Sequence, residues 1–141
     1  MGSIGETSSW QAIRDAKKAE QTSRIPSEWL LSGSLLKEAQ AAVDPRPYAA
    51  KSGILNQEEL EITSLDATDL TERVAKGVYT SVQVVTDFCK RSAIGQQLCN
   101  YLTEVMFTQA IEEANKLDQY YRKNGRVKGP LHGLPMTVKV K

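Results

Sequence analysis

One lysine near the end of the sequence stands out for acid–base chemistry. Lys139 lies in the run 136–141, Met-Thr-Val-Lys-Val-Lys, in which apolar and polar residues alternate. A lysine amine can act as a base where partial burial and a fixed hydrogen-bond partner favour its neutral form. By itself, a strand lysine is more often an exposed residue that keeps a sheet edge from pairing. The role of Lys139 therefore depends on the residues around it.

His132 is a second candidate base, and it is the only histidine of the chain. It stands in a loop between Leu131 and Gly133, with no Asp or Glu near it in the sequence. A catalytic histidine is commonly oriented by a carboxylate or carbonyl on its other ring nitrogen. The sequence favours a structural role, in which the imidazole is hydrogen-bonded to the loop backbone.

The candidate nucleophiles are dispersed along the chain. Cys89 lies at helical spacing among apolar residues, which favours a small core residue over a reactive thiol. A serine nucleophile needs an adjacent base and oriented backbone donors. The serines instead fit helix caps, turns and solvated positions, and none stands in a glycine-rich nucleophile context: Ser3, Ser8, Ser9, Ser23, Ser27, Ser32, Ser34, Ser52, Ser64, Ser81 and Ser92.

Helices must position these side chains, because helical spacing dominates the sequence. The clearest helix is predicted over 105–123. Its apolar face consists of Phe107, Ala110, Ile111, Ala114, Leu117 and Tyr121. Its charged and polar residues, Asp118 among them, are assigned to the opposite, solvated face. Further helices are expected at about 9–21, 26–29, 35–43, 56–62, 66–76 and from Thr80-Ser81 to near Gly95.

A single strand is predicted at residues 136–141. Its alternation puts Met136 and Val138 on the face opposite Lys139. One strand cannot form a sheet, so the predicted fold is mostly α with one terminal strand whose partners are missing. The apolar face of 107–121 is expected to lie toward that missing sheet and to be partly exposed.

Composition excludes several classes of function. The 141 residues carry a net charge of +1, and the basic residues are dispersed, so nothing indicates nucleic-acid or anionic-membrane binding. No leader or membrane span is recognisable. Cys89 and Cys99 on one helix would be roughly 15 Å apart, too far for a disulfide, which favours reduced thiols and the cytoplasm. With one histidine, the cysteines form no metal-ligand cluster, and no metal is expected.

The last segment, Gly-Pro-Leu-His-Gly-Leu-Pro-Met-Thr-Val-Lys over 129–139, resembles the first catalytic motif of the amidase signature family. Upstream segments follow in the order found in fungal acetamidase-type members, and together the resemblance covers roughly residues 8–139. These segments are 25–30, 52–63, 89–94, 100–104 and 110–118. The ordered series is far more specific than a lone Gly-Pro-Leu-His-Gly.

The resemblance implies a fold and a chemistry. The fold is the N-terminal part of an α/β protein, a mixed sheet with helices on both faces, with an N-terminal helical arm at 1–50 and the start of the amidase signature domain at 51–141. The family hydrolyses small carboxamides to acid and ammonia or amine with a Ser-Ser-Lys triad, without a cofactor. Lys139 stands at the position of the catalytic lysine.

The sequence departs from the family pattern after Lys139. An acidic residue usual in the family is replaced by Val140, and Lys141 adds a second positive charge. The glycine- and serine-rich segment that carries both partner serines and the oxyanion donors is missing, so we expect a chain cut just after the lysine motif and inactive by itself.

A non-catalytic role is the alternative that the sequence leaves open. The chain could be a helical interaction module or a degenerate gene product that docks on a full-length relative, or it could form a homo-oligomer. The apolar face of 107–121 and the unpaired strand at 136–141 would supply the contacts, the latter by strand addition.

Overall fold

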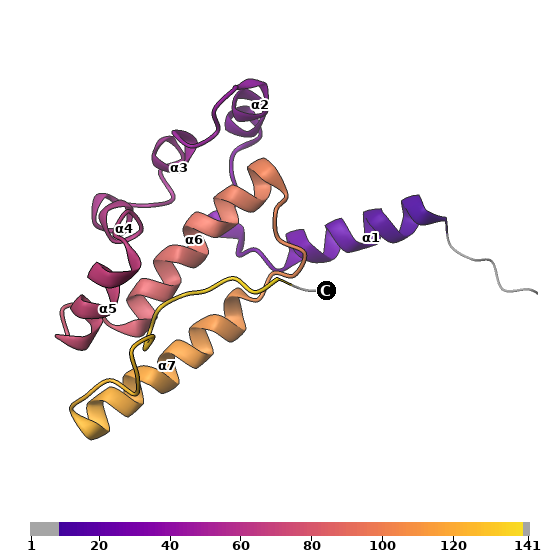
Figure 1. Ribbon diagram of the computed structural model, residues 1–141. Coiled ribbons are helices and arrows are strands. Elements are labelled where there is room, and N and C mark those ends of the chain that lie inside the picture. Colours follow the sequence, from indigo (N-terminus) through magenta and orange to yellow (C-terminus); the bar gives the residue numbers. More distant parts are fainter. Residues whose placement is uncertain (1–8, 140–141) are drawn as a thin grey trace, which may run out of the picture.

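The computed structural model describes residues 9–139, in which helix α6 is the central element. Figure 1 shows a row of short helices along one side of α6 and helix α7 along the other. No strand is present between residues 9 and 139, so the mostly helical prediction is confirmed. The elements are α1 (Trp10–Ser23), η1 (Ser27–Trp29), α2 (Gly33–Ala41), α3 (Tyr48–Lys51), α4 (Gln57–Ile62), α5 (Ala67–Ala75), α6 (Ser81–Cys99) and α7 (Phe107–Asn124).

Side chains at the helix starts explain where several helices begin. Ser9 and Thr80 accept hydrogen bonds from the first-turn amides of α1 and α6. Asn56 and Glu59 form a capping box at the start of α4, in which each side chain binds the other's backbone N–H. Gly125 ends α7 with a φ of 66°, the left-handed conformation that glycine adopts without strain. These starts and stops agree with the predicted helices.

Two apolar clusters lie on different sides of α6. The first includes Val85 and Cys89 of α6 with residues of η1 and α7, and the rings of Trp29 and Phe107 are 5.9 Å apart in it. The second joins Val84 to α4 and α5. Because Ile25 and Trp29 belong to the first cluster, the N-terminal segment shares a core with α6 and α7. The division into 1–50 and 51–141 stays a prediction.

The apolar face of α7 is partly covered. It packs on α6, and both Phe107 and Ala114 are buried there, with Ala110 and Ile111 packed at the edge of the same cluster. Part of the face stays exposed, as expected from the sequence, because Ala110, Ile111, Leu117 and Tyr121 are only half-buried. The partner that covers the rest of the face is α6. Helix α3 was not predicted; it buries Tyr48, whose hydroxyl donates to Glu38 of α2 at 3.0 Å.

The predicted strand at 136–141 was wrong over the residues that the structure describes. Residues 134–139 have no regular secondary structure, and Val140 and Lys141 lie outside the described residues. Figure 1 shows this segment running back along the α6–α7 pair. The physical reason is that a strand, unlike a helix, takes its backbone hydrogen bonds from a neighbouring strand, and residues 9–139 contain no such neighbour.

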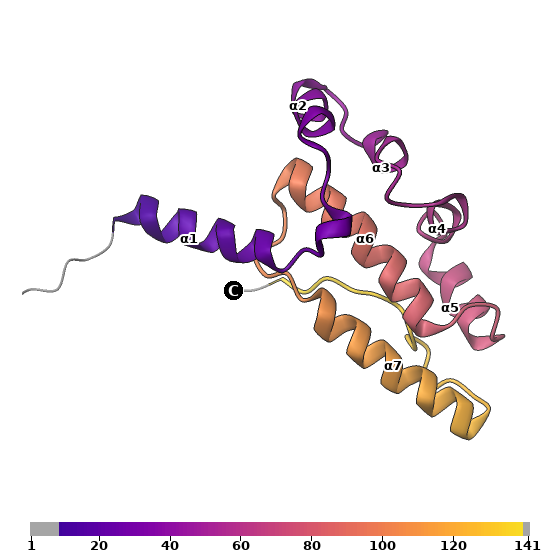
Figure 2. The ribbon, with the colours of Figure 1, turned by 180° about the vertical axis from the view of Figure 1, so that it is seen from behind.

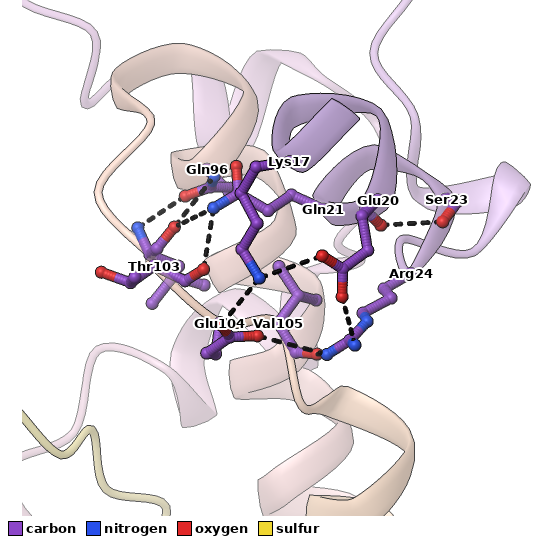
Figure 3. Close-up of polar contacts among 10 residues, drawn as sticks. Lys17, Glu20, Gln21, Ser23, Arg24, Gln96, Thr103, Glu104 and Val105 are labelled. Atoms are coloured by element: carbon purple, nitrogen blue, oxygen red, sulfur yellow. Dashed lines mark hydrogen bonds and ion pairs between the residues drawn. The ribbon is translucent and has the colours of Figure 1, made fainter. Parts of the chain in front are cut away.

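Polar contacts fasten helix α1 to the connection between α6 and α7 (Figure 3). Lys17 Nζ lies 2.7 Å from Glu104 Oε1, and Arg24 Nη1 lies 3.5 Å from Glu104 Oε2. The Gln21 side-chain amide donates to the carbonyl of Thr103 at 2.8 Å. These contacts come from the C-terminal half of α1 and from Arg24, which follows its last residue, so this is the end of the helix that is held.

The rest of α1 projects from the body, as the reverse view in Figure 2 shows. No residue of α1 is buried, and Trp10 and Ile13 are 66% and 60% exposed. None of the helices described between residues 9 and 139 is both long and apolar enough to cross a bilayer.

Candidate functional site

The segment that carries Lys139 begins at a tight turn spanning Gly129–Leu134. The His132 N–H donates to the carbonyl of Gly129 at 3.2 Å, and the Leu134 N–H donates to that of Leu131 at 3.2 Å. Gly133 has a φ of 76°, which a side chain would strain. The turn therefore satisfies its own backbone at a position where glycine is required.

His132 is buried in this turn and has the predicted structural role. Only 5% of its surface is exposed, and its Nδ1 accepts a hydrogen bond from the Lys128 N–H at 3.0 Å. The rings of Tyr120 and Tyr121 lie 6.4 and 6.3 Å from the imidazole. Burial lowers the pKa of His132, and the charge of Asp118 opposes that shift only in part. A neutral imidazole is needed here, because only the neutral form can accept from Lys128.

The turn is pressed against the first residues of α6. A Cβ at position 133 would lie 2.7 Å from the Ser81 Oγ and 3.3 Å from the Ser81 Cα. Ser81 is fully buried. Directly beside it, the Asp118 carboxylate accepts from the N–H groups of Ser81 at 2.7 Å and Val82 at 3.0 Å. A carboxylate at a helix N-terminus is favourable both for the free N–H groups and for the helix dipole.

The assignment of Asp118 to the solvated face of α7 was therefore wrong. Asp118 follows the buried Ala114 by one helical turn, so it lies on the inward face, where it meets the unpaired amides of α6. The sequence held the signal for this contact: a carboxylate four residues after a core alanine, and a helix start at Thr80 whose amides need acceptors.

Ser81, Asp118 and His132 meet at the start of α6, which the sequence analysis did not foresee. They do not form a hydrolytic triad. The Ser81 Oγ and the His132 Nε2 are both buried without a hydrogen-bond partner among residues 9–139, so the two are not bonded to each other. Asp118 binds backbone amides rather than the imidazole. A serine nucleophile needs a hydrogen-bonded base, so this cluster is structural.

Lys139 itself lies beyond the turn in an exposed segment. Met136 and Val138, which the alternation puts on the face opposite Lys139, are 66% and 84% exposed. Among residues 9–139, no second layer covers these two side chains.

The cysteines behave as the sequence indicates. Cys89 is buried in the α6–α7 cluster, and burial raises the pKa of its thiol to about 11, which disfavours a reactive thiolate. Cys99 is exposed, both lie on α6, and both are free. Between residues 9 and 139, no group of three or more His, Cys, Asp and Glu side chains could hold a metal ion.

Comparisons with known proteins agree with the resemblance seen in the sequence. The family model described as Amidase matches residues 83–140. An acetamidase of Emericella nidulans is 42% identical over 131 residues, which is 93% of this chain and 23% of the relative. An amidase of Gibberella moniliformis is 40% identical over 92% of this chain and 25% of the relative.

A solved structure gives the same answer for the fold. The chain is similar to fatty acid amide hydrolase, with a TM-score of 0.73 and 30% identity over 90% of this chain and 23% of that one. The chain spans about a quarter of the length of the relatives it matches. By these matches in sequence and fold, the chain belongs to the amidase signature family.

Proposed function

We propose that this chain contributes the lysine-bearing segment of an amidase that hydrolyses small carboxamides to a carboxylic acid and ammonia or an amine. The observation that carries the proposal is the family-model match over 83–140, a range that includes Lys139 and the turn from which it extends. Acetamidase and amidase are the names of the relatives, and a small aliphatic amide is the substrate class proposed.

In this proposal Lys139 is the base of a Ser-Ser-Lys triad. The neutral amine takes a proton from a bridging serine, which takes the proton of the nucleophilic serine as its oxygen bonds to the amide carbon. The C–N bond breaks as the leaving ammonia or amine takes that proton back through the bridging serine. Water, deprotonated by the same serine and lysine, then attacks the acyl-enzyme ester, which releases the acid and returns the proton to the nucleophilic serine. Both serines, and the donors for the oxyanion, are assigned to the part of the enzyme that the chain does not span.

The exposure of Lys139 bears on whether the chain is active by itself. An amine serves as a base near neutral pH only where its surroundings disfavour the charged form, and Lys139 is exposed in the described residues. We therefore propose that the chain is inactive by itself. Incubation with a fluorophosphonate probe, which labels activated serines, should leave the chain unlabelled; stoichiometric labelling would overturn this part.

A chimaera tests the role of Lys139 directly. The corresponding quarter of the Emericella nidulans acetamidase is replaced by this chain, and acetamide hydrolysis is measured. Lys139→Ala should remove activity by at least about a thousandfold, while Lys123→Ala, which removes an exposed lysine from the last turn of α7, should change it little. An active Lys139→Ala chimaera would refute the catalytic assignment.

The exposed segment favours one alternative, a module that docks on a partner amidase or on a second copy by strand addition. Its support is the exposed pair Met136 and Val138 beside unpaired backbone. Light scattering and titration against the acetamidase that lacks its matching quarter would measure this. Restored hydrolysis on mixing favours the catalytic proposal, whereas tight binding without hydrolysis favours the docking module.

The proposed compartment is the cytoplasm. Cys89 and Cys99 are both free in the structure, as expected of thiols in a reducing compartment. A fluorescent fusion of the complete gene product would test the location.

A further inference from the structure

We infer that His132 and Gly133 are positioning residues that fix the start and direction of the segment carrying Lys139. This inference rests on the proposed function of Lys139, because its position affects activity only if it acts as the catalytic base. It assigns a role to two residues of the turn that stand seven and six residues before Lys139 in the sequence.

The first step is the fixed origin of the segment. Gly133 lies directly on the backbone of Ser81, since a Cβ there would be 3.3 Å from the Ser81 Cα. Ser81 in turn is tied to α7 by Asp118, which accepts from its N–H at 2.7 Å. The turn therefore rests on the point where the Asp118 carboxylate of α7 binds the first residues of α6.

The second step is the closure of the turn by His132. The imidazole Nδ1 accepts from the Lys128 backbone N–H at 3.0 Å, and the backbone N–H of His132 donates to the Gly129 carbonyl. One side chain thus binds the turn across four residues, from Lys128 to His132. Because the imidazole is 5% exposed, water does not compete for the bond, and removing the acceptor leaves a backbone donor without its partner.

The third step is the direction in which the segment leaves. Leu134 packs against the cluster of Ile62, Leu70 and Val84, and Pro135 restricts its own φ and the backbone of Leu134. From this anchor only five residues lead to Lys139, which reach at most about 17 Å when extended. With origin and direction fixed, the lysine can lie only within that distance of Leu134, on the side to which the segment leaves; with the turn loosened, both limits are lost.

Two substitutions of His132 separate positioning from simple packing. Asn places an oxygen where Nδ1 lies and keeps the acceptor for Lys128, whereas Leu fills similar space without one. In the 141-residue chain, His132→Leu should increase amide exchange at Lys128 and the fast motion of residues 134–139, measured by the 15N heteronuclear NOE. His132→Asn should restore both. Unchanged order of 134–139 in His132→Leu would overturn the inference.

The chimaera supplies the catalytic readout. His132→Leu should lower kcat by roughly 10- to 100-fold with little change in KM, and His132→Asn should recover most of the loss. Equal activity of the Leu and Asn variants would overturn the inference while leaving Lys139 in place. If Lys139→Ala is fully active, the proposed function fails instead, and the NMR result then reports the turn alone.

Discussion

Two anchors at opposite ends of α6 hold the two outer segments of the molecule. At its C-terminal end, Lys17, Arg24 and Glu104 fasten α1 through ion pairs whose side chains are about 40% exposed. At its N-terminal end, Ser81, Gly133 and the Asp118 carboxylate fasten the turn that leads to Lys139. The side chains of the first anchor are exposed to solvent, whereas in the second Ser81 and Gly133 are buried and the Asp118 carboxylate is half-buried.

The difference explains how each segment tolerates change. Exposed ion pairs contribute little, because water and salt compete for both partners. Buried donors and acceptors contribute more, because a lost partner leaves a group that water cannot reach. Helix α1 keeps its structure despite the weaker anchor, since a helix satisfies its backbone internally, whereas residues 135–139 need outside partners even beyond a strong anchor.

The largest expected effect comes from breaking the buried anchor at Asp118. Asp118→Ala removes the acceptor of two α6 amides, at 2.7 and 3.0 Å, and should lower the free energy of unfolding by about 2–3 kcal/mol. Urea denaturation followed by circular dichroism measures this. Asp118→Asn keeps one acceptor and should lose about half as much. A loss below about 0.5 kcal/mol for the Ala variant would show that the anchor is not buried in solution.

The turn itself gives the next largest effect. Gly133→Ala should cost about 2 kcal/mol, because its φ of 76° disfavours a side chain and the new Cβ would lie 2.7 Å from the Ser81 Oγ. Gly129→Ala is the matched control in the same turn, since nothing lies within 4 Å of its added Cβ. Thermal unfolding should separate the two variants clearly; equal midpoints would contradict the close approach of Gly133 to α6.

A buried carboxyl between the two anchors gives a smaller effect that depends on pH. Asp87 on α6 is 4% exposed with an unpartnered Oδ2, and burial, with the nearby charge of Glu59, raises its pKa from 3.8 to about 6. The folded state therefore binds the proton more tightly than the unfolded state. Its stability falls as pH rises from about 4 to about 6, and the full loss persists above that window.

Asp87→Asn should remove this pH dependence. Because the amide carries no charge, the variant should be more stable than the parent by about 1–2 kcal/mol at pH 8, with the gain shrinking toward pH 4. Glu58, Glu59 and Lys90 also face this site, so the comparison of parent and variant at each pH isolates Asp87. If the difference in unfolding free energy between Asp87→Asn and the parent were the same at every pH, Asp87 would not be the source of the pH dependence.

The sequence predicted most of the helices because their signals are local. Ser9, Asn56 and Thr80 cap the helices that they were expected to cap, and Gly125 ends α7. The strand at 136–141 failed because it needed a partner from a distant part of the chain. The element that covers the face of α7 is also distant in the sequence: it is α6. Local sequence patterns indicate which secondary structure a segment prefers, but they do not indicate which distant segment it packs against.

The candidate site divides in the same way. Lys139 and the structural role of His132 were predicted from the motif and its loop, and the hydrogen bond from Lys128 confirms the latter. The inward position of Asp118 was missed, because in a list of polar residues on α7 it resembles any other charged side chain. Only the unpaired amides of α6, in a different part of the chain, give it a partner.

The smallest effect on stability is expected at the exposed ion pairs of Glu104, and it tests how they differ from the anchor at Asp118. Glu104→Gln removes the partner of both Lys17 and Arg24 and should lower global stability by less than about 1 kcal/mol. Amide exchange in α1 should rise, and raising NaCl from about 0.05 to about 0.5 M should reproduce that rise in the parent, since salt screens exposed pairs. Amide exchange in α6 and at Lys128 should not respond to salt.

Gln21→Ala separates the two kinds of contact, because the bond from Gln21 to the Thr103 carbonyl is not an ion pair. Its loss should increase amide exchange in α1 at every salt concentration. If salt loosened the Gly129–Leu134 turn as much as α1, the two anchors would not differ in burial, and the distinction drawn between them would fail.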